Sequence, residues 1–311
     1  MSSLELFQYQ YFQVNKFIKK IFGQFPPVKR LLKYQTMWEP GHYYSAIPDK
    51  ETGLATTGKS VNQTIFPNAI DLHEEGQLQL MDQLIPFMKE SNFRNEEKNN
   101  GHRFFNKNGI YGYSDALILE AMIRLLKPSK IIEAGSGFSS VLMLDVNEKY
   151  FNNSIQIKCI EPYPKRLYSL LREGDKKRIS IEERGLQTID LAVFRDLGKN
   201  DILFIDSTHV AKTGSDLLYL FFEILPALQS GVYIHFHDIF KNFEYLPDHF
   251  HWSKGFAWNE NYFLRSFLMY NQQFETVLYS AFLESKYKDH ITSKMSDYPF
   301  STGAQFWMKK L

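Results

Sequence analysis

The sequence predicts a doubly wound α/β domain, in which helices cover both faces of a mostly parallel sheet. From Ser114 onward, short β-branched runs alternate with longer runs that suit helices, and this alternation is typical of parallel strands joined by helical crossovers. The first strand ends in the glycine turn Glu133-Ala-Gly-Ser-Gly137, which leads directly into a helix. The chain then closes with two strand-like runs that we expect to pair antiparallel. Together these observations predict a Rossmann-like sheet of seven strands, preceded by an N-terminal helical and irregular extension.

The N-terminal extension differs from the rest of the chain in its pattern of apolar and basic residues. Apolar residues at alternating spacings of three and four, from Leu4 to Ile21, predict a basic amphipathic helix in residues 1–35. We expect this helix to pack on its own domain or to form a homodimer, and a membrane-surface helix is the alternative. Residues 36–108 are expected to be mostly irregular, apart from a helix near 75–89. We therefore divide the chain into an N-terminal extension and substrate lid at 1–108 and a cofactor-binding domain at 109–311. The alternative to a lid is that the irregular part of the extension simply wraps the surface of the domain.

Each element of the second domain follows from its pattern and its boundaries. Ser114 or Asp115 can cap the first helix, and Pro128 follows its end. The expected strands are 130–133, 155–161, 179–182, 201–206, 231–237, 274–280 and 304–311. The expected helices are 116–126, 139–149, 165–173, 189–197, 215–228 and 259–270. We expect no helical crossover between the last two strands, because antiparallel neighbours do not require one.

The composition limits the classes of function. A hydrophobic content of 44% and a charged content of 23% are ordinary for a soluble globular protein. The formal net charge of +1 gives no electrostatic reason to expect nucleic-acid binding. The single cysteine, Cys159, excludes an internal disulfide and favours a reducing compartment. The sequence has no apolar run of about 18 residues and no signal-peptide pattern, so we expect a cytoplasmic protein without membrane insertion.

The glycine turn predicts a nucleotide-cofactor pocket at the carboxyl end of the first strand. Gly135 and Gly137, with Ser136 between them, lack a Cβ and can take a positive φ that lets the backbone approach a ligand. Ser139 and Ser140 can cap the following helix, whose unpaired N–H groups face the same crevice. Ser140 stands where the dinucleotide fingerprint has its third glycine, so the turn alone does not select the cofactor.

Acidic residues close the first two strands. Glu161 lies 24 residues beyond Gly137 and can accept two hydrogen bonds from a ribose diol. Glu133 suits a cofactor with a cationic amino-acid tail, and the alternative is that its carboxylate orients the glycine loop. Tyr113, just before the first helix of the domain, is expected to line the cofactor crevice.

A second group of residues follows strands four and five. Because these strands are expected neighbours, Asp206, His237 and Asp238 should converge at one edge of the crevice. Two carboxylates and one imidazole suit a divalent metal such as Mg²⁺, whereas the alternative is that the aspartates cap helices and the histidines are buried. His209 is the candidate general base, with Asp206 as the second catalytic candidate, because neutral imidazole takes a proton from a hydroxyl near pH 7. His235 is expected to lie deeper, in the core.

These residues resemble those of class I S-adenosylmethionine-dependent methyltransferases, over residues 115–311. The resemblance rests on the glycine turn, Glu161, Asp206 and the closing antiparallel strands. More narrowly, three motifs resemble a bacterial group of poorly characterised methyltransferases: Ile205-Asp-Ser-Thr-His209, Ile234-His-Phe-His-Asp-Ile-Phe240 and Trp258-Asn-Glu-Asn-Tyr262. The chain is also similar to metal-dependent O-methyltransferases, whose first metal aspartate ends strand four as Asp206 does. His237 departs from their pattern, since they have an acidic residue at that position.

The resemblance implies that S-adenosylmethionine is the cofactor. We predict methyl transfer to a hydroxyl of a small molecule, sugar or glycan, with His209 as the base. An NAD-dependent oxidoreductase is one alternative, but it is disfavoured by the missing third glycine, the closing strand pair and the absence of a Tyr-x-x-x-Lys pair placed for hydride chemistry. A non-catalytic binding protein on the same fold is the other alternative.

Overall fold

The computed structural model describes residues 41–62, 69–94, 96–98, 101–246, 258–300 and 305–311. The helix predicted in residues 1–35 lies outside these ranges. The chain divides into two compact units, Met1–Gly53 and Leu54–Leu311. Helix α3 (Lys50–Asn62) forms where we expected irregular chain. Its glycines and threonines have low helix propensity and form no apolar stripe, which explains why the sequence pattern missed it. The domain boundary at residue 108 stays a prediction.

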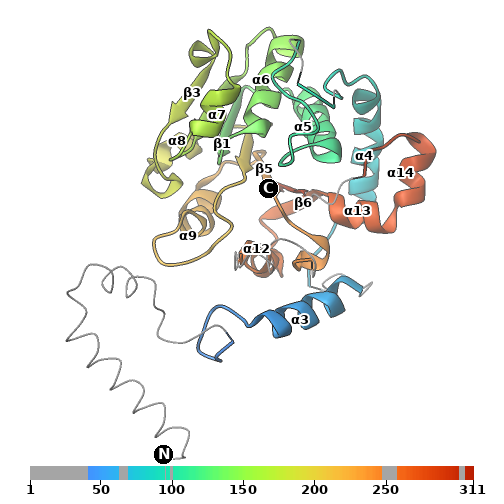
Figure 1. Cartoon of the computed structure of the whole chain (residues 1–311), viewed down its shortest axis with the longest axis vertical. Helices are drawn as coiled ribbons and strands as arrows, with labels where there is room; N and C mark the ends of the chain where they lie inside the picture. The colour runs from blue at the N-terminus through green and yellow to red at the C-terminus, as the bar shows by residue number, and fades with distance from the viewer. Residues whose placement is uncertain (1–40, 63–68, 95, 99–100, 247–257, 301–304) are drawn as a thin grey trace, which may run out of the picture. The chain divides into compact units, whose positions relative to one another are not determined.

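The second unit contains a seven-stranded sheet with the order β3-β2-β1-β4-β5-β7-β6 (Figure 1). Its strands are β1 (Lys130–Ala134), β2 (Gln156–Ile160), β3 (Ile179–Glu182), β4 (Ile202–Ile205), β5 (Tyr233–His237), β6 (Phe274–Tyr279) and β7 (Gln305–Lys310). Strand β7 runs antiparallel between β5 and β6, whereas the other neighbours are parallel. The predicted mostly parallel sheet with an antiparallel C-terminal strand is therefore confirmed.

Helices cover the sheet and differ from the expected ones in two places. The longer helices are α4 (Glu74–Lys89), α5 (Tyr113–Leu126), α6 (Phe138–Phe151) and α12 (Glu260–Leu268). The shorter ones are α7 (Lys165–Leu170), α8 (Leu191–Arg195), α9 (Asp216–Tyr219), α10 (Leu225–Ala227), α13 (Ser280–Lys286) and α14 (Lys288–Lys294). The expectation of no helix between the last two strands is wrong, since α13 and α14 connect β6 to β7. Each has seven residues, which is too short to display a clear helical period.

The second difference lies in the predicted helix 215–228. A π-helical turn, Leu220–Ile224, separates α9 from α10. Pro226 lies in the first turn of α10 and has no N–H to continue a regular ladder. The wider π-helical turn before Pro226 accommodates the absence of this N–H donor.

The core lies between the sheet and its helices. All four residues of β4 are buried, as is typical of a parallel strand covered on both faces. On one side of the sheet, Arg103 is buried and donates to Asp145 of α6 at 2.6 Å and to both carboxylate oxygens of Asp175 at 2.6 and 2.8 Å. The backbone N–H groups of Arg103 and Phe104 also donate to Asp145. These bonds hold the start of the segment that leads to Tyr113 against α6.

Candidate functional site

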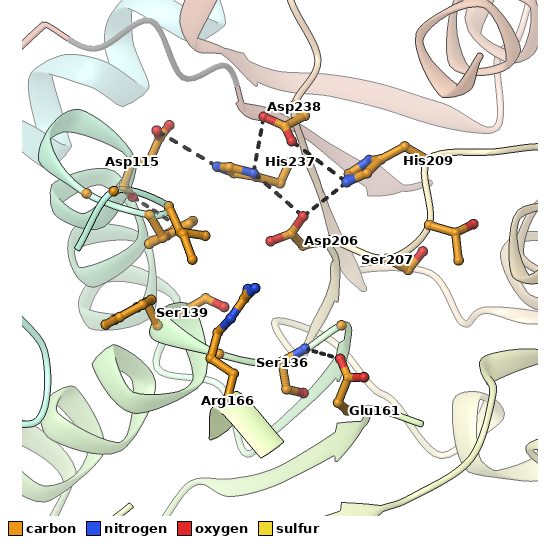
Figure 2. Close-up of a pocket in the computed structure, with 18 of the residues that line it drawn as sticks. Asp115, Ser136, Ser139, Glu161, Arg166, Asp206, Ser207, His209, His237 and Asp238 are labelled. Atoms are coloured by element: carbon orange, nitrogen blue, oxygen red, sulfur yellow. Dashed lines mark hydrogen bonds and ion pairs between the residues drawn. The ribbon is translucent and has the colours of Figure 1, made fainter. Parts of the chain in front are cut away.

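A cavity of about 830 Å³ lies at the carboxyl ends of the central strands (Figure 2). One part of its lining comes from the glycine turn and from Glu161 after β2. The other part comes from the ends of β4 and β5. The predicted residues that line it are Tyr113, Gly135, Ser136, Gly137, Ser139, Glu161, Asp206, His209, His237 and Asp238. Of the residues predicted in the glycine turn, at the strand ends and at Tyr113, only Glu133 is absent from this lining.

The two glycines of the turn have different conformations. Gly135 has a φ of +82°, and a Cβ placed on it would lie 1.7 Å from the carbonyl oxygen of Asp206. Gly137 has a φ of 176°, which is extended backbone, so the expected positive φ is wrong at this position. Helix α6 begins at Phe138, with Gly137 as its N-cap, and the N–H of Gly137 donates to Ser140 Oγ at 2.9 Å. Only Gly135 is therefore required by backbone geometry.

Glu133 lies behind the turn rather than in the cavity. Its side chain is fully buried and accepts hydrogen bonds from the hydroxyls of Ser139 and Ser140 and from the Cys159 thiol at 3.1 Å. This arrangement favours the alternative in which Glu133 orients the loop. Of the two serines, Ser140 also takes part in capping α6, because its Oγ accepts the N–H of the N-cap residue Gly137. Burial raises the pKa of Glu133 to about 7, despite the opposing effect of the three hydrogen bonds.

The raised pKa of Glu133 predicts that stability falls as pH rises from about 5 to 8. A carboxyl group whose pKa is higher in the folded state favours folding below its unfolded pKa of 4.5, and this contribution disappears as pH rises through about 7. The difference corresponds to at most about 3 kcal/mol of unfolding free energy. Urea denaturation of Glu133→Gln should show a flatter pH dependence, with exposed Glu183→Gln as the control. Equal slopes in Glu133→Gln and the wild type would contradict this prediction.

Two backbone segments position Glu161, the glycine turn after β1 and the residues that follow β2. Its Oε2 accepts the N–H of Ser136 at 3.1 Å, and its Oε1 accepts the N–H of Tyr163 at 2.8 Å. Each carboxylate oxygen retains a lone pair, so the side chain can still accept bonds from a diol. Tyr113 also lines the cavity, with a φ of 52° and its N–H bonded to Asn106 Oδ1.

The opposite part of the cavity centres on His209. Its Nε2 lies 3.4 Å from Asp206 Oδ1 and 3.7 Å from Asp238 Oδ2, while its Nδ1 lies 2.6 Å from Glu260 Oε2. His209 and Asp238 both have a φ of 58°, a left-handed conformation that non-glycine residues rarely adopt and that recurs at functional sites. Glu260 lies within the motif Trp258-Asn-Glu-Asn-Tyr262, but the sequence alone did not predict its contact with His209.

His237 occupies the other side of the same carboxylates, as Figure 2 shows. Its Nδ1 lies 3.7 Å from Asp206 Oδ1 and 3.6 Å from Asp238 Oδ1, and its Nε2 lies 3.8 Å from Asp115 Oδ2. Asp115, expected only as a helix cap, lies in α5 and accepts a hydrogen bond from Gln305 at 3.0 Å. Each imidazole therefore contacts the central pair of aspartates on one side and a further buried carboxylate on the other.

His235 behaves as the expected core histidine. It is fully buried, and its ring centroid lies 4.0 Å from that of Phe204 and 4.8 Å from that of Trp307. Burial lowers the pKa of His235 well below its ordinary value, which favours a neutral ring.

The carboxylates control the protonation of the other two histidines. Burial alone lowers the pKa of His209, but hydrogen bonds and charge from Asp206, Glu260 and Asp238 outweigh it and raise this pKa well above its ordinary value. For His237, burial is likewise outweighed by Asp238, Asp206 and Asp115, so its pKa is also raised. The carboxylates therefore favour the protonated forms of both imidazoles.

The same cluster contains a candidate metal-binding group. Asp206, His209 and Asp238 each offer a ligand atom, and these atoms lie within 4.8 Å of one another. The predicted set had His237 as the third donor, so the group found in the described part of the chain differs by one histidine.

Some predicted features are not part of this site. Gln187, which follows β3 and whose place in the sequence makes it a candidate contact of the adenine edge, is exposed and outside the cavity lining. Trp38, which the sequence offers as a candidate wall of the substrate pocket or as a packing residue, lies outside the described residues. In the described ranges, no helix has the length and apolar character needed to cross a membrane.

Comparisons with known proteins agree with this geometry. A family model described as a methyltransferase domain matches residues 132–239, which contain the glycine turn, Glu161 and the aspartates of the cluster. An uncharacterized protein of Archaeoglobus fulgidus is 32% identical over 174 residues, covering 53% of this chain and 76% of that relative. Because this relative is archaeal, the predicted bacterial grouping stays a prediction.

Similar solved structures include two methyltransferases. The SAH-bound methyltransferase PaMTH1 of Podospora anserina is 16% identical, with 84% of this chain and 96% of that chain covered and a TM-score of 0.44. The O-methyltransferase TomG of Streptomyces achromogenes, in complex with SAM, is 13% identical, with 85% and 100% covered and a TM-score of 0.38. Residues 132–239 therefore form a methyltransferase domain, and the sheet and the site agree with the class I S-adenosylmethionine-dependent methyltransferases that the sequence resembles.

Proposed function

We propose that this protein transfers the methyl group of S-adenosylmethionine to a hydroxyl group of a small-molecule, sugar or glycan acceptor. The observation that carries the proposal is a single cavity lined by both the glycine turn with Glu161 and the cluster of Asp206, His209 and Asp238. Cofactor and acceptor can therefore meet within one cavity.

The glycine turn and Glu161 fit the cofactor. The bare backbone at Gly135 packs against the carbonyl of Asp206, which leaves the turn close to the cavity. Glu161 is held by two backbone N–H groups and can accept bonds from the ribose. When bound, S-adenosylmethionine supplies an electrophilic methyl group, so the chain's own tasks are to orient the acceptor and to receive its proton.

The cluster around His209 suits a hydroxyl acceptor. Asp206 and Asp238 can accept hydrogen bonds from its hydroxyl groups, and His209 Nε2 can receive the proton while Glu260 holds the other ring nitrogen. Trp258 packs against His209, with ring centroids 4.4 Å apart, and also lines the cavity. An aromatic face beside carboxylates can contact the apolar face of a sugar while its hydroxyls are bound. Because the pKa of His209 is raised, the rate should increase with pH as this imidazole loses its proton.

Asp206, Asp238 and His209 also fit a divalent cation. Their donors are the oxygen and nitrogen atoms that such ions bind, and Glu260 behind Nδ1 supports His209 as carboxylates commonly support metal-bound histidines. When bound, a cation such as Mg²⁺ supplies positive charge that favours loss of a hydroxyl proton. In that case His209 acts as a ligand and not as the base, and the two roles are separable by experiment.

Binding of S-adenosylhomocysteine, measured by isothermal titration, tests the proposed cofactor. We expect micromolar affinity for the wild type and a loss of roughly 10-fold or more in Glu161→Ala, because a charge-assisted hydrogen bond contributes about 1.5–3 kcal/mol. Glu183→Ala, which removes an exposed carboxylate outside the cavity, should bind like the wild type. Labelled methyl transfer to a panel of hydroxylated acceptors, with and without Mg²⁺, then tests the reaction.

Two outcomes would contradict the proposed function. Absence of S-adenosylhomocysteine binding by demonstrably folded protein would favour a non-catalytic role. Binding of NAD in its place would favour an oxidoreductase. Cytoplasmic location, a homodimer through the N-terminal helix and the absence of nucleic-acid binding also remain proposals.

A further inference from the structure

Arg166 is a cavity residue for which the sequence predicted no role. It belongs to α7, and its exposed side chain reaches into the cavity beside the glycine turn (Figure 2). Its Cδ lies 3.3 Å from the position that a Cβ on Gly137 would occupy, and its Nη1 lies 4.0 Å from it. Within the described ranges, its guanidinium forms no ion pair and no side-chain hydrogen bond.

The charge of Arg166 contrasts with the rest of the lining. Of the described residues that line the cavity, it alone has a lysine or arginine side chain. The carboxylates in the same lining belong to Asp115, Glu161, Asp206 and Asp238. The imidazoles of His209 and His237 lie against Asp206 and Asp238, so their charge is offset by these aspartates. A ligand carboxylate beside the glycine turn would therefore be attracted mainly by the guanidinium.

The proposed cofactor has a charge pattern that matches this arrangement. Its sulfonium and ammonium groups are positive and suit the carboxylates, whereas its amino-acid tail ends in a carboxylate. A guanidinium presents N–H donors in a planar fork that binds a carboxylate through two parallel hydrogen bonds. We propose that Arg166 binds the carboxylate of the cofactor's amino-acid tail, an inference that rests on the proposed function and adds a specific binding residue to it.

The position of Arg166 favours the cofactor over an acidic acceptor as the source of the carboxylate. The Arg166 side chain packs against Gly137 of the glycine turn, which belongs to the cofactor part of the cavity. The acceptor part, around His209 and Trp258, contains the opposing aspartates. The extended backbone at position 137 does not itself require glycine. The absence of a Cβ there leaves space for the Arg166 side chain, which is a separate reason for glycine at this position.

A paired ligand comparison tests this inference. Affinities for S-adenosylhomocysteine and for its decarboxylated analogue, which keeps the amine and lacks only the carboxylate, are measured by titration calorimetry. Arg166→Gln should weaken S-adenosylhomocysteine binding by about 10-fold to 100-fold and leave the affinity for the analogue unchanged. The adjacent Lys165→Gln is the matched control, because it removes the same charge from a side chain outside the cavity lining. Arg166→Lys should recover part of the loss.

The outcomes separate this inference from the proposed function. If Arg166→Gln weakens both ligands equally, or neither, the carboxylate contact is wrong even though the cofactor binds. If cofactor binding is unchanged but Arg166→Gln raises the KM for acidic acceptors and not for neutral ones, the guanidinium recognises the acceptor and the inference is overturned. Failure of the wild type to bind either ligand would overturn the proposed function itself.

Discussion

Replacing Gly135 with alanine is expected to lower the free energy of unfolding by about 3–5 kcal/mol, because backbone strain and overpacking act together. The residue has a φ of +82°, and the new methyl group would lie 1.7 Å from the carbonyl oxygen of Asp206. Neither the backbone of Gly135 nor that of Asp206 can easily move, since the N–H of Asp206, directly after β4, donates to the carbonyl of Ala134 in the paired strand β1 at 2.9 Å. Urea denaturation measures the loss, and cofactor affinity should fall with it.

Gly137→Ala is the matched control for the effect at Gly135. It adds the same methyl group two residues away, where φ is 176° and the neighbouring atom is the Cδ of the exposed Arg166 side chain. Because this flexible side chain can move, the free energy of unfolding of Gly137→Ala should stay within about 1 kcal/mol of the wild-type value. A Gly135→Ala protein as stable as Gly137→Ala would show that the turn relaxes without cost and would refute the close approach to Asp206.

Replacing His209 with glutamine is expected to reduce the rate of methyl transfer by about 10²–10⁴-fold, the range that a positioned general base contributes. Glutamine can still donate a hydrogen bond to one of the two carboxylates, Asp206 or Glu260, but it cannot accept the acceptor's proton at neutral pH. The rate is measured at saturating S-adenosylmethionine with an acceptor found in the panel. His290→Gln is the control, since His290 also contacts a carboxylate, Asp82 at 2.9 Å, but does not line the cavity.

Metal binding by the same His209 variant separates its two possible roles. If His209 is the base, His209→Gln should lose the rate but retain both S-adenosylhomocysteine affinity and any Mg²⁺ or Mn²⁺ affinity of the wild type. If His209 is a ligand, metal affinity should fall with the rate, and Asp206→Asn should show the same joint loss. An unchanged rate in His209→Gln would exclude both roles.

The sheet and one edge of the site followed from local patterns in the sequence. Buried β-branched runs have a length and period typical of parallel strands, and chemically active residues stand directly after them. Parallel strands place their carboxyl ends at one edge. The convergence of Glu161, Asp206 and Asp238 on one cavity could therefore be predicted, and the structure places all three there.

Contributions from separate helices could not be predicted in this way. Glu260 reaches His209 from α12, Asp115 reaches His237 from α5, and Arg166 enters the cavity from α7. Nothing in the local sequence distinguishes these side chains from the charged residues of any helix surface. Their partners lie far away along the chain or across a turn, so only packing reveals them.

By itself, the sequence determined the strand-and-turn framework, the glycine that must follow the first strand and the types of residue at the strand ends. Only the tertiary structure decided that Glu133 is buried behind the turn, that Gly137 is extended and that His209 joins the two aspartates. The physical reason is that hydrophobic periodicity and backbone propensity are local properties. The direction of a side chain and the charges around it depend on segments that meet only after folding.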